Sequence, residues 1–163
     1  MKTSLIVCLF SFILSAQLFA QNKGDFTIGL DMAYAYDLRE EAYNLTLEYV
    51  FIDRVALAPN WSSYLLRKNL TINTLNIDAR YYAPTIGKFD VYGIVGFGRS
   101  TVINDVEIFG IPIRTYETTE NGWNFGYGMY FRLTQHFRIH GQIKYTTALL
   151  DDAVMQLGMA FTF

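Results

Sequence analysis

The two histidines are the residues of this sequence best suited to acid–base chemistry. His136 and His140 are the only histidines in 163 residues, and a hydrolase or acyltransferase would need one of them beside a serine and a carboxylate. His136 falls in a predicted tight turn and His140 a short way into the next strand, both at the end opposite the longer loops. A metal site would need further convergent ligands, which the pattern does not offer. We therefore predict a protein that is not an enzyme and holds no metal or cofactor.

Cysteine chemistry and nucleic-acid binding are also disfavoured. The single cysteine, Cys8, lies within a predicted export signal, so the mature chain would have no disulfide and no thiolate ligand. Of the 13 Lys and Arg residues, Lys2 is lost with that signal, which leaves 12 against 15 Asp and Glu and a net charge of −3. This balance argues against a nucleic-acid partner.

Most charged residues of the predicted strands share one face, which we expect to point into a barrel. That face carries Asp31, Glu48, Asp78, Arg80, Asp90, Arg132, Arg138, His140 and Lys144. The signs nearly balance, and an eight-stranded barrel is wide enough only for side chains to fill. Because an unpaired buried charge is very costly, we predict that Glu48, Asp78, Arg80 and Arg132 interlock in a network that plugs the lumen. The alternative is a narrow ion path.

The elements that would position these residues are strands. Apolar and polar residues alternate with a period of two along the chain, and no window shows helical periodicity. The alternation predicts strands over residues 26–34, 43–51, 55–61, 75–82, 89–98, 123–132, 137–145 and 155–163. Pro59 suggests an irregularity in the third strand. The predicted fold class is all-β, an eight-stranded antiparallel up-and-down transmembrane β-barrel.

The connections between the predicted strands alternate in length. Three are short, residues 52–54, 84–88 and 134–136, and four are mostly longer, residues 37–41, 62–69, 100–121 and 147–152. Short periplasmic turns and longer outer loops are typical of outer-membrane barrels. An even number of strands places both termini at the short-turn end. We therefore predict an outer-membrane location with both termini in the periplasm.

The aromatic residues sort by height along the predicted barrel. They make up 17% of the chain, and aliphatic residues lie between two rings of them. The loop-end ring is Tyr34, Tyr43, Trp61, Trp123 and Tyr145, and the turn-end ring is Phe26, Phe51, Tyr81, Phe89, Phe131, Phe137 and Phe163. The two interfaces of a bilayer favour such rings, so we predict that outer-membrane lipid contacts this face.

The first 20 residues are typical of a secretory signal. Lys2 gives a positive start, Leu5–Leu14 is an apolar run, and Ala16 and Ala20 are small residues near a cleavage point. The run is too short for a spanning helix of roughly 20 residues. We predict cleavage after Ala20, with residues 1–20 as the signal peptide and 21–163 as a single barrel domain.

The carboxyl-terminal end carries the most specific motif. Gln156, Gly158, Phe161 and Phe163 form the pattern Gln-x-Gly-x-x-Phe-x-Phe at the end of an alternating strand. This pattern resembles the terminal signal that barrel-assembly machinery recognises. Together with the predicted strands, it makes the mature chain similar to the small outer-membrane β-barrel family typified by OmpX and the OmpA membrane domain, and to porin-family proteins of Bacteroidota type. The resemblance implies a Gram-negative cell surface and no particular activity.

The longest connection, residues 100–121, is rich in residues that favour strands. Ile108, Phe109, Ile111 and Ile113 lie near a predicted turn at Gly110. We consider two arrangements, a hairpin that protrudes past the membrane and a lid folded over the barrel mouth. A protruding hairpin would offer an apolar patch and an exposed strand edge for a surface partner.

Three functions are compatible with this sequence. The first is a non-enzymatic, monomeric outer-membrane protein with a structural or surface-interaction role in adhesion or partner binding. The second is a minor porin for small solutes. The third is a secreted soluble barrel that carries a ligand, like a lipocalin, which would need an apolar interior.

Overall fold

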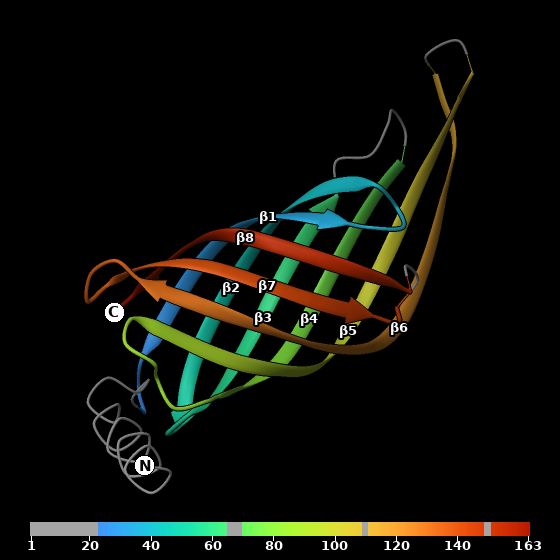
Figure 1. Ribbon diagram of the computed structural model, residues 1–163. Helices are drawn as coiled ribbons and strands as arrows, with labels where there is room; N and C mark the ends of the chain where they lie inside the picture. The colour runs from blue at the N-terminus through green and yellow to red at the C-terminus, as the bar shows by residue number, and fades with distance from the viewer. Residues whose placement is uncertain (1–22, 65–69, 109–110, 149–150) are drawn as a thin grey trace, which may run out of the picture.

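The barrel predicted from the sequence is confirmed in a computed structural model. The model describes residues 23–64, 70–108, 111–148 and 151–163, and for residues 105–108 and 111–114 it describes the backbone alone. In these residues eight strands close into one barrel, in which neighbours along the chain pair antiparallel and the last strand pairs with the first (Figure 1). The strands are β1 (Phe26–Ala35), β2 (Glu40–Ile52), β3 (Val55–Tyr64), β4 (Leu70–Tyr82), β5 (Phe89–Ile108), β6 (Ile111–Arg132), β7 (Phe137–Thr146) and β8 (Asp152–Thr162). The described residues include no helix long and apolar enough to cross a membrane.

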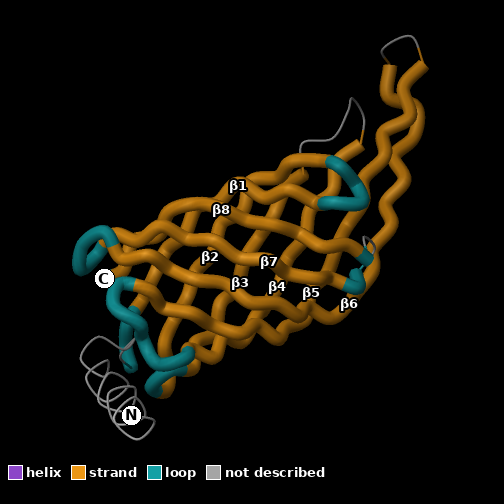
Figure 2. Tube along the Cα trace, in the orientation of Figure 1, coloured by secondary structure: helices purple, strands orange, loops and turns teal. Residues whose placement is uncertain are grey.

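Most strands run further toward the loop end than the sequence predicted. β4 begins at Leu70 and β8 at Asp152, so much of the predicted loops is strand. β5 and β6 continue as a hairpin that stands well clear of the barrel (Figures 1 and 2). The prediction fell short because inward positions near the loop end, such as Ile72 and Val154, carry apolar side chains, which breaks the apolar-outside, polar-inside alternation of the band.

The irregularity predicted at Pro59 is confined to one ladder. Pro59 pairs with Ile77 of β4, whereas the β2–β3 ladder has a gap at Pro59, with the same register on both sides from Thr46 opposite Asn60 to Tyr49 opposite Leu57. Proline has no N–H to donate to β2 at this point. β3 nevertheless continues to Tyr64.

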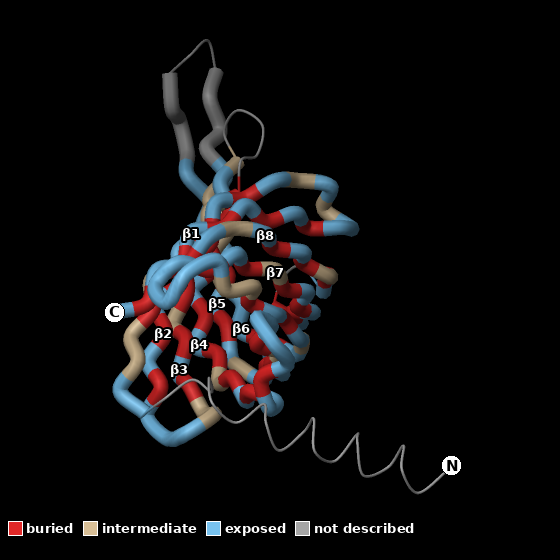
Figure 3. Tube along the Cα trace, turned by 60° about the vertical axis from the view of Figure 1, so that its left-hand side comes forward, coloured by how far each residue is buried: buried red, intermediate tan, exposed pale blue. Residues whose placement is uncertain are grey.

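The pattern of burial is that of a membrane barrel, with polar residues inside and apolar residues outside. Buried and exposed residues alternate along the part of each strand that forms the barrel wall (Figure 3). Eight of the nine charged or histidine residues predicted to face inward are buried. The ninth, Arg132, is partly buried. The outer face instead exposes large apolar residues such as Leu30, Leu157 and Met159 at 66, 65 and 58%. The interior is therefore not the apolar cavity that a soluble ligand carrier needs.

The aromatic residues of both predicted rings lie on the outer face at a constant separation. Four strands place residues of the two predicted rings eight positions apart, at 26 and 34, 43 and 51, 123 and 131, and 137 and 145, and β5 adds Phe97, eight positions from Phe89. Eight residues at about 3.3 Å, tilted by roughly 40°, span about 20 Å along the barrel axis. Between these rings, no outward position of the described strands carries a charged side chain. The turn-end ring is closely packed. The centres of the Phe26 and Phe163 side-chain rings lie 5.9 Å apart, and those of Phe89 and Phe131 lie 5.0 Å apart.

Candidate functional sites in the lumen and on the hairpin

The centre of the lumen is built around a fully buried ion pair between β2 and β4. Arg80 Nη1 donates to Glu48 Oε2 at 2.5 Å, and both side chains are fully shielded from solvent. Tyr82 donates its hydroxyl to both carboxylate oxygens of Glu48 at 2.8 Å. Arg80 also donates to the Tyr130 hydroxyl at 2.8 Å and to Gln142 Oε1 at 3.0 Å. These hydrogen bonds connect β2 and β4 with β6 and β7 across the lumen.

A second pair lies nearer the loop end. Lys144 Nζ donates to Asp78 Oδ2 at 3.0 Å, and both residues are buried. The amides of Asn60 and Asn124 also donate to the Asp78 carboxylate, at 2.8 and 2.9 Å. Asp78 therefore accepts hydrogen bonds on both oxygens, which offsets the cost of burying its charge.

The third pair joins β5 and β6 near the turn end. Arg132 forms a two-pronged contact with the Asp90 carboxylate and donates to Thr85 Oγ1 at 3.0 Å. The expectation that Arg132 interlocks with Glu48, Asp78 and Arg80 stays a prediction. The Tyr92 and Tyr130 rings also lie in the lumen, with their centres 5.5 Å apart. Arg138, also assigned to the network, is buried with its guanidinium 5.7 Å from the centre of the Tyr130 ring.

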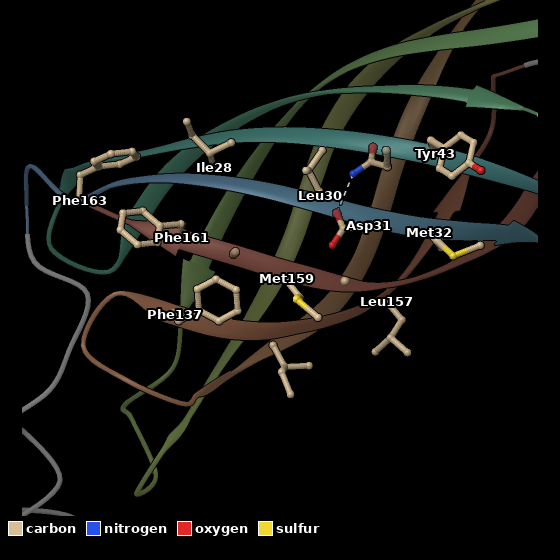
Figure 4. A pocket seen from close by; sticks show the side chains of 14 residues that line it. Ile28, Leu30, Asp31, Met32, Tyr43, Phe137, Leu157, Met159, Phe161 and Phe163 are labelled. Carbon is tan, nitrogen blue, oxygen red and sulfur yellow. Dashed lines mark hydrogen bonds between the residues drawn. The ribbon is translucent and has the colours of Figure 1, made fainter.

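The structure also brings together a carboxylate, an imidazole and a phenol that the sequence analysis did not connect. His140 Nδ1 lies 2.6 Å from Asp31 Oδ1, and His140 Nε2 lies 2.5 Å from the Tyr92 hydroxyl. Asn44 donates to the other Asp31 oxygen at 2.9 Å (Figure 4). Asp31, Tyr92 and His140 are all buried. Such a triad resembles acid–base machinery in its groups, but a reaction would need a route for substrate to fully buried atoms.

Two buried apolar clusters also fill the lumen. The loop-end cluster consists of Ala33, Ala35, Ala42, Tyr64, Ile72 and Val154, with Leu38 and Val102 packed against it. The other, deeper in the barrel, consists of Val50, Ala56, Tyr82, Tyr92, Ile94, Tyr130 and Ala160. Burial and the nearby Asp152 carboxylate raise the pKa of Tyr64, so its phenol stays neutral at the loop end. An ion crossing the barrel would have to displace both clusters.

The loop-end cluster is held in place by Asp152 at the start of β8. Its carboxylate accepts the backbone N–H of Asp37 at 2.9 Å and that of Leu38 at 3.1 Å. These bonds fix the turn between β1 and β2, which brings Leu38 against the cluster. Because Asp152 is buried in the barrel wall, these two hydrogen bonds attach the turn to the barrel.

The carboxyl-terminal motif divides between the two faces of β8. Gln156 is buried and accepts a hydrogen bond from Gln142 at 2.6 Å. Phe161 and Phe163 point outward, with rings 5.0 Å apart, and line a shallow apolar groove of ≈930 Å³ that runs over β1, β7 and β8 (Figure 4). Gly158 leaves room for its neighbours, since a Cβ there would lie 2.4 Å from Asp31 Oδ1.

The protruding hairpin is the main feature outside the lumen. β4 pairs with β5 up to Asn104, and β7 pairs with β6 from Asn124. Beyond these points the described part of β6 pairs with β5 alone, as the register from Asn121 opposite Arg99 onward shows. The protruding arrangement is thus the one observed, not the lid. Of the residues predicted at its tip, Phe109 lies outside the described residues, and only the backbone is described for Ile108, Ile111 and Ile113.

Metal chemistry finds no support in these sites. The described residues contain no group of three or more His, Cys, Asp or Glu side chains placed to hold a metal ion. The chemistry that the arrangement does offer is internal hydrogen bonding, together with backbone edges on the hairpin.

Known proteins similar to this chain are β-barrels. The family model described as outer membrane protein beta-barrel domain matches residues 6–163. The amino-terminal β-barrel domain of Pseudomonas aeruginosa OprF is 20% identical, with a TM-score of 0.71 over 88% of this chain and 100% of that chain. Ail, the attachment invasion locus protein of Yersinia pestis, is 17% identical, with a TM-score of 0.59 over 86% and 99%. OprG, an outer membrane protein of P. aeruginosa, is 17% identical, with a TM-score of 0.59 over 88% and 98%. No curated protein sequence matches the chain.

Proposed function

The chain belongs to the outer membrane protein β-barrel domain family, and we propose that it is a non-enzymatic surface-interaction protein whose protruding β5–β6 hairpin binds an extended segment of another protein. The observation that carries this proposal is the edge of β6, which has no strand beside it in the described residues beyond the end of β7. An unpaired edge is a template for an added strand. The structural likeness to Ail, an attachment protein by its name, is compatible with this role but shows the fold alone.

The bonds at the end of β7 indicate which residues of β6 offer their backbone at this edge. Trp123 turns both its backbone groups toward β7: its carbonyl accepts the Thr147 N–H at 3.0 Å, and its N–H donates to Thr147 Oγ1 at 2.8 Å. Backbone groups of successive residues in a strand point to opposite sides. Thr119 and Glu117 therefore present N–H and C=O groups where a further strand would lie. The partner strand would run along these two residues.

The rival functions have less support. The porin alternative requires an open path, whereas the lumen holds three ion pairs and two apolar clusters. The lipocalin-like alternative requires an apolar interior, whereas the buried face is polar and charged. The signal peptide at residues 1–20 falls outside the described residues. Cleavage after Ala20, periplasmic termini, a monomeric state and recognition of the carboxyl-terminal motif by assembly machinery are parts of this proposal.

Thr119 provides a matched pair of variants for the test. Thr119→Pro removes one N–H from the open edge without removing a bond to β5, whereas Thr119→Ala keeps the N–H and changes only the side chain. Binding of cells to surfaces or host proteins should fall with Thr119→Pro and persist with Thr119→Ala. Replacing residues 102–119 with a short Gly/Ser turn should abolish it while the barrel stays folded.

Two results would contradict the proposal. If Thr119→Pro and Thr119→Ala bind equally well, the strand edge is not the binding element. If the Gly/Ser replacement lowers the thermal stability of the barrel greatly and changes no surface phenotype, the hairpin is a structural part of the barrel.

A further inference from the structure

Three amides and one carboxylate form a closed ring of hydrogen bonds in the lumen near the loop end. Asn60 donates to Asp78 Oδ2 at 2.8 Å and to the Ala58 carbonyl at 3.0 Å. Asn76 donates to Asn60 Oδ1 at 2.9 Å. Asn124 donates to Asn76 Oδ1 and to Asp78 Oδ1, both at 2.9 Å. The ring therefore joins β3, β4 and β6 around the Asp78 carboxylate.

This ring fixes the direction in which the Asn124 amide faces. A carboxylate offers only lone pairs, so the Asn124 atom that lies 2.9 Å from Asp78 Oδ1 is the nitrogen. That nitrogen has two protons, and the bonds to Asp78 and Asn76 use both. If the amide were turned over, its oxygen would face two other oxygens. Asn124 Oδ1 therefore lies on the far side of the amide and is left as an acceptor.

Two buried oxygens beside this ring have no hydrogen-bond partner among the residues that the structure describes. They are Asn124 Oδ1 and Thr146 Oγ1. Asn124 is fully buried, and Thr146 is 3% exposed. The two residues lie directly opposite each other on β6 and β7, where the Cβ atoms of paired residues are about 4.5–5.5 Å apart. Because buried polar atoms nearly always bond to protein or to ordered water, this pair of oxygens marks a binding site.

The groups around the two oxygens select a small neutral ligand. Asn124 Oδ1 requires a hydrogen-bond donor, so an anion does not fit. The Lys144 ammonium bonds to Asp78 Oδ2 at 3.0 Å, on the carboxylate that Asn124 also bonds, and its charge disfavours a second cation. The Thr146 hydroxyl has a proton to donate. A ligand that accepts from Thr146 and donates to Asn124 satisfies both, and water does so.

Small side chains face the lumen at this level on each of the eight strands. In chain order they are Ala33, Ala42, Ser62, Thr74, Ser100, Asn124, Thr146 and Val154, and all are buried. The large buried side chains, such as Arg80, Tyr92 and Tyr130, lie nearer the turn end. The number of strands is the same at both levels. Small side chains therefore leave more of the lumen to a molecule of the size of water.

We propose that the barrel binds a water molecule between β6 and β7, which accepts a hydrogen bond from the Thr146 hydroxyl and donates one to Asn124 Oδ1. This water extends the ring around Asp78 to β7 and pairs both buried oxygens. The polar network that fills the lumen is then hydrated on its loop-end side. The site is independent of the binding role proposed for the hairpin.

A crystal structure of the refolded barrel, at a resolution that shows ordered water, tests the site directly. Electron density for one water molecule is expected within hydrogen-bond distance of both Asn124 Oδ1 and Thr146 Oγ1. A direct hydrogen bond between these two side chains would overturn the proposal. So would an ion between them, or the lack of any density there.

Urea unfolding of Thr146→Val in lipid vesicles provides an independent test, because the direction of its effect depends on the ligand. Valine replaces the hydroxyl with a methyl group of similar size. If the hydroxyl bonds to water, its loss should lower the urea midpoint. If the hydroxyl has no partner, the methyl group should raise the midpoint, since a buried unpaired hydroxyl is costly. An unchanged or higher midpoint would therefore contradict the proposal.

Thr74→Val is the matched control for this measurement. The Thr74 hydroxyl is buried at the same level and has a known partner, Ser100 Oγ, at 3.1 Å. Thr74→Val should lower the urea midpoint, and Thr146→Val should resemble it. A fall with Thr74→Val and a rise with Thr146→Val would show that the Thr146 hydroxyl holds no water.

Discussion

Arg80→Met is expected to destabilise the barrel strongly, because it leaves the Glu48 carboxylate buried without its cation. Both side chains are fully shielded from solvent and joined at 2.5 Å. Removing one partner of such a pair typically costs about 3–5 kcal/mol. Tyr82 and Tyr130 would remain near the carboxylate, but phenols do not neutralise its charge. We therefore expect a loss near the upper part of that range.

The double variant Arg80→Met with Glu48→Gln separates the charge from the packing. It removes both charges, and the Tyr82 hydroxyl still has an oxygen to donate to. Its cost should be less than half that of Arg80→Met alone, since no uncompensated charge stays buried. Arg99→Met, at an exposed position of β5, is the matched control and should change stability by no more than about 0.5 kcal/mol.

The assay is urea unfolding of the refolded barrel in lipid vesicles, followed by tryptophan fluorescence and by heat-modifiable mobility on gels. The reasoning would be refuted if Arg80→Met unfolded at the same urea concentration as Arg99→Met. It would also be refuted if the double variant were less stable than Arg80→Met, because the buried charge would then not be the source of the cost.

Three further predictions concern assembly, conduction and the loop end. Deleting Phe163 should leave export intact but lower the amount of folded, heat-modifiable protein in the outer membrane; normal levels would show that the motif is not recognised. Purified wild-type barrel in planar bilayers should give no stable conductance steps, because paired charges and apolar clusters fill the lumen; reproducible steps would support the porin alternative. Asp152→Ala should release two backbone N–H groups of the β1–β2 turn and cost about 1–3 kcal/mol in urea unfolding, whereas Glu120→Ala, at an exposed position of β6, should cost far less.

The strands could be predicted from the sequence only where one face meets lipid and the other the lumen. In residues 43–51 this contrast gives a clean alternation, and β2 contains that segment. In residues 115–121 almost all positions on both faces are exposed, so the pattern carries no signal, although these residues pair with β5. The predicted rings of aromatic residues follow from the same contrast, since they mark the boundaries of the band.

The lumen shows a different limit. Alternation identifies which charged residues face inward, but their partners depend on the stagger of the strands around the barrel. Glu48 and Arg80 come from strands that are not neighbours, as do Asp78 and Lys144. For this reason the pairing of Arg132 with Asp90 was not predicted. The link between Asp31 and His140 was missed because it depends on their shared register with Gly158.

The central claim is that a band of about 20 Å between the aromatic rings lies in a bilayer. Depth-dependent quenching of tryptophan by brominated lipids tests it most directly. The chain has two tryptophans, so Trp61→Phe leaves Trp123 alone in the loop-end ring. The account predicts strongest quenching by bromines about 10 Å from the bilayer centre, half the ring separation. Strongest quenching at the centre, or none at any depth, would contradict it.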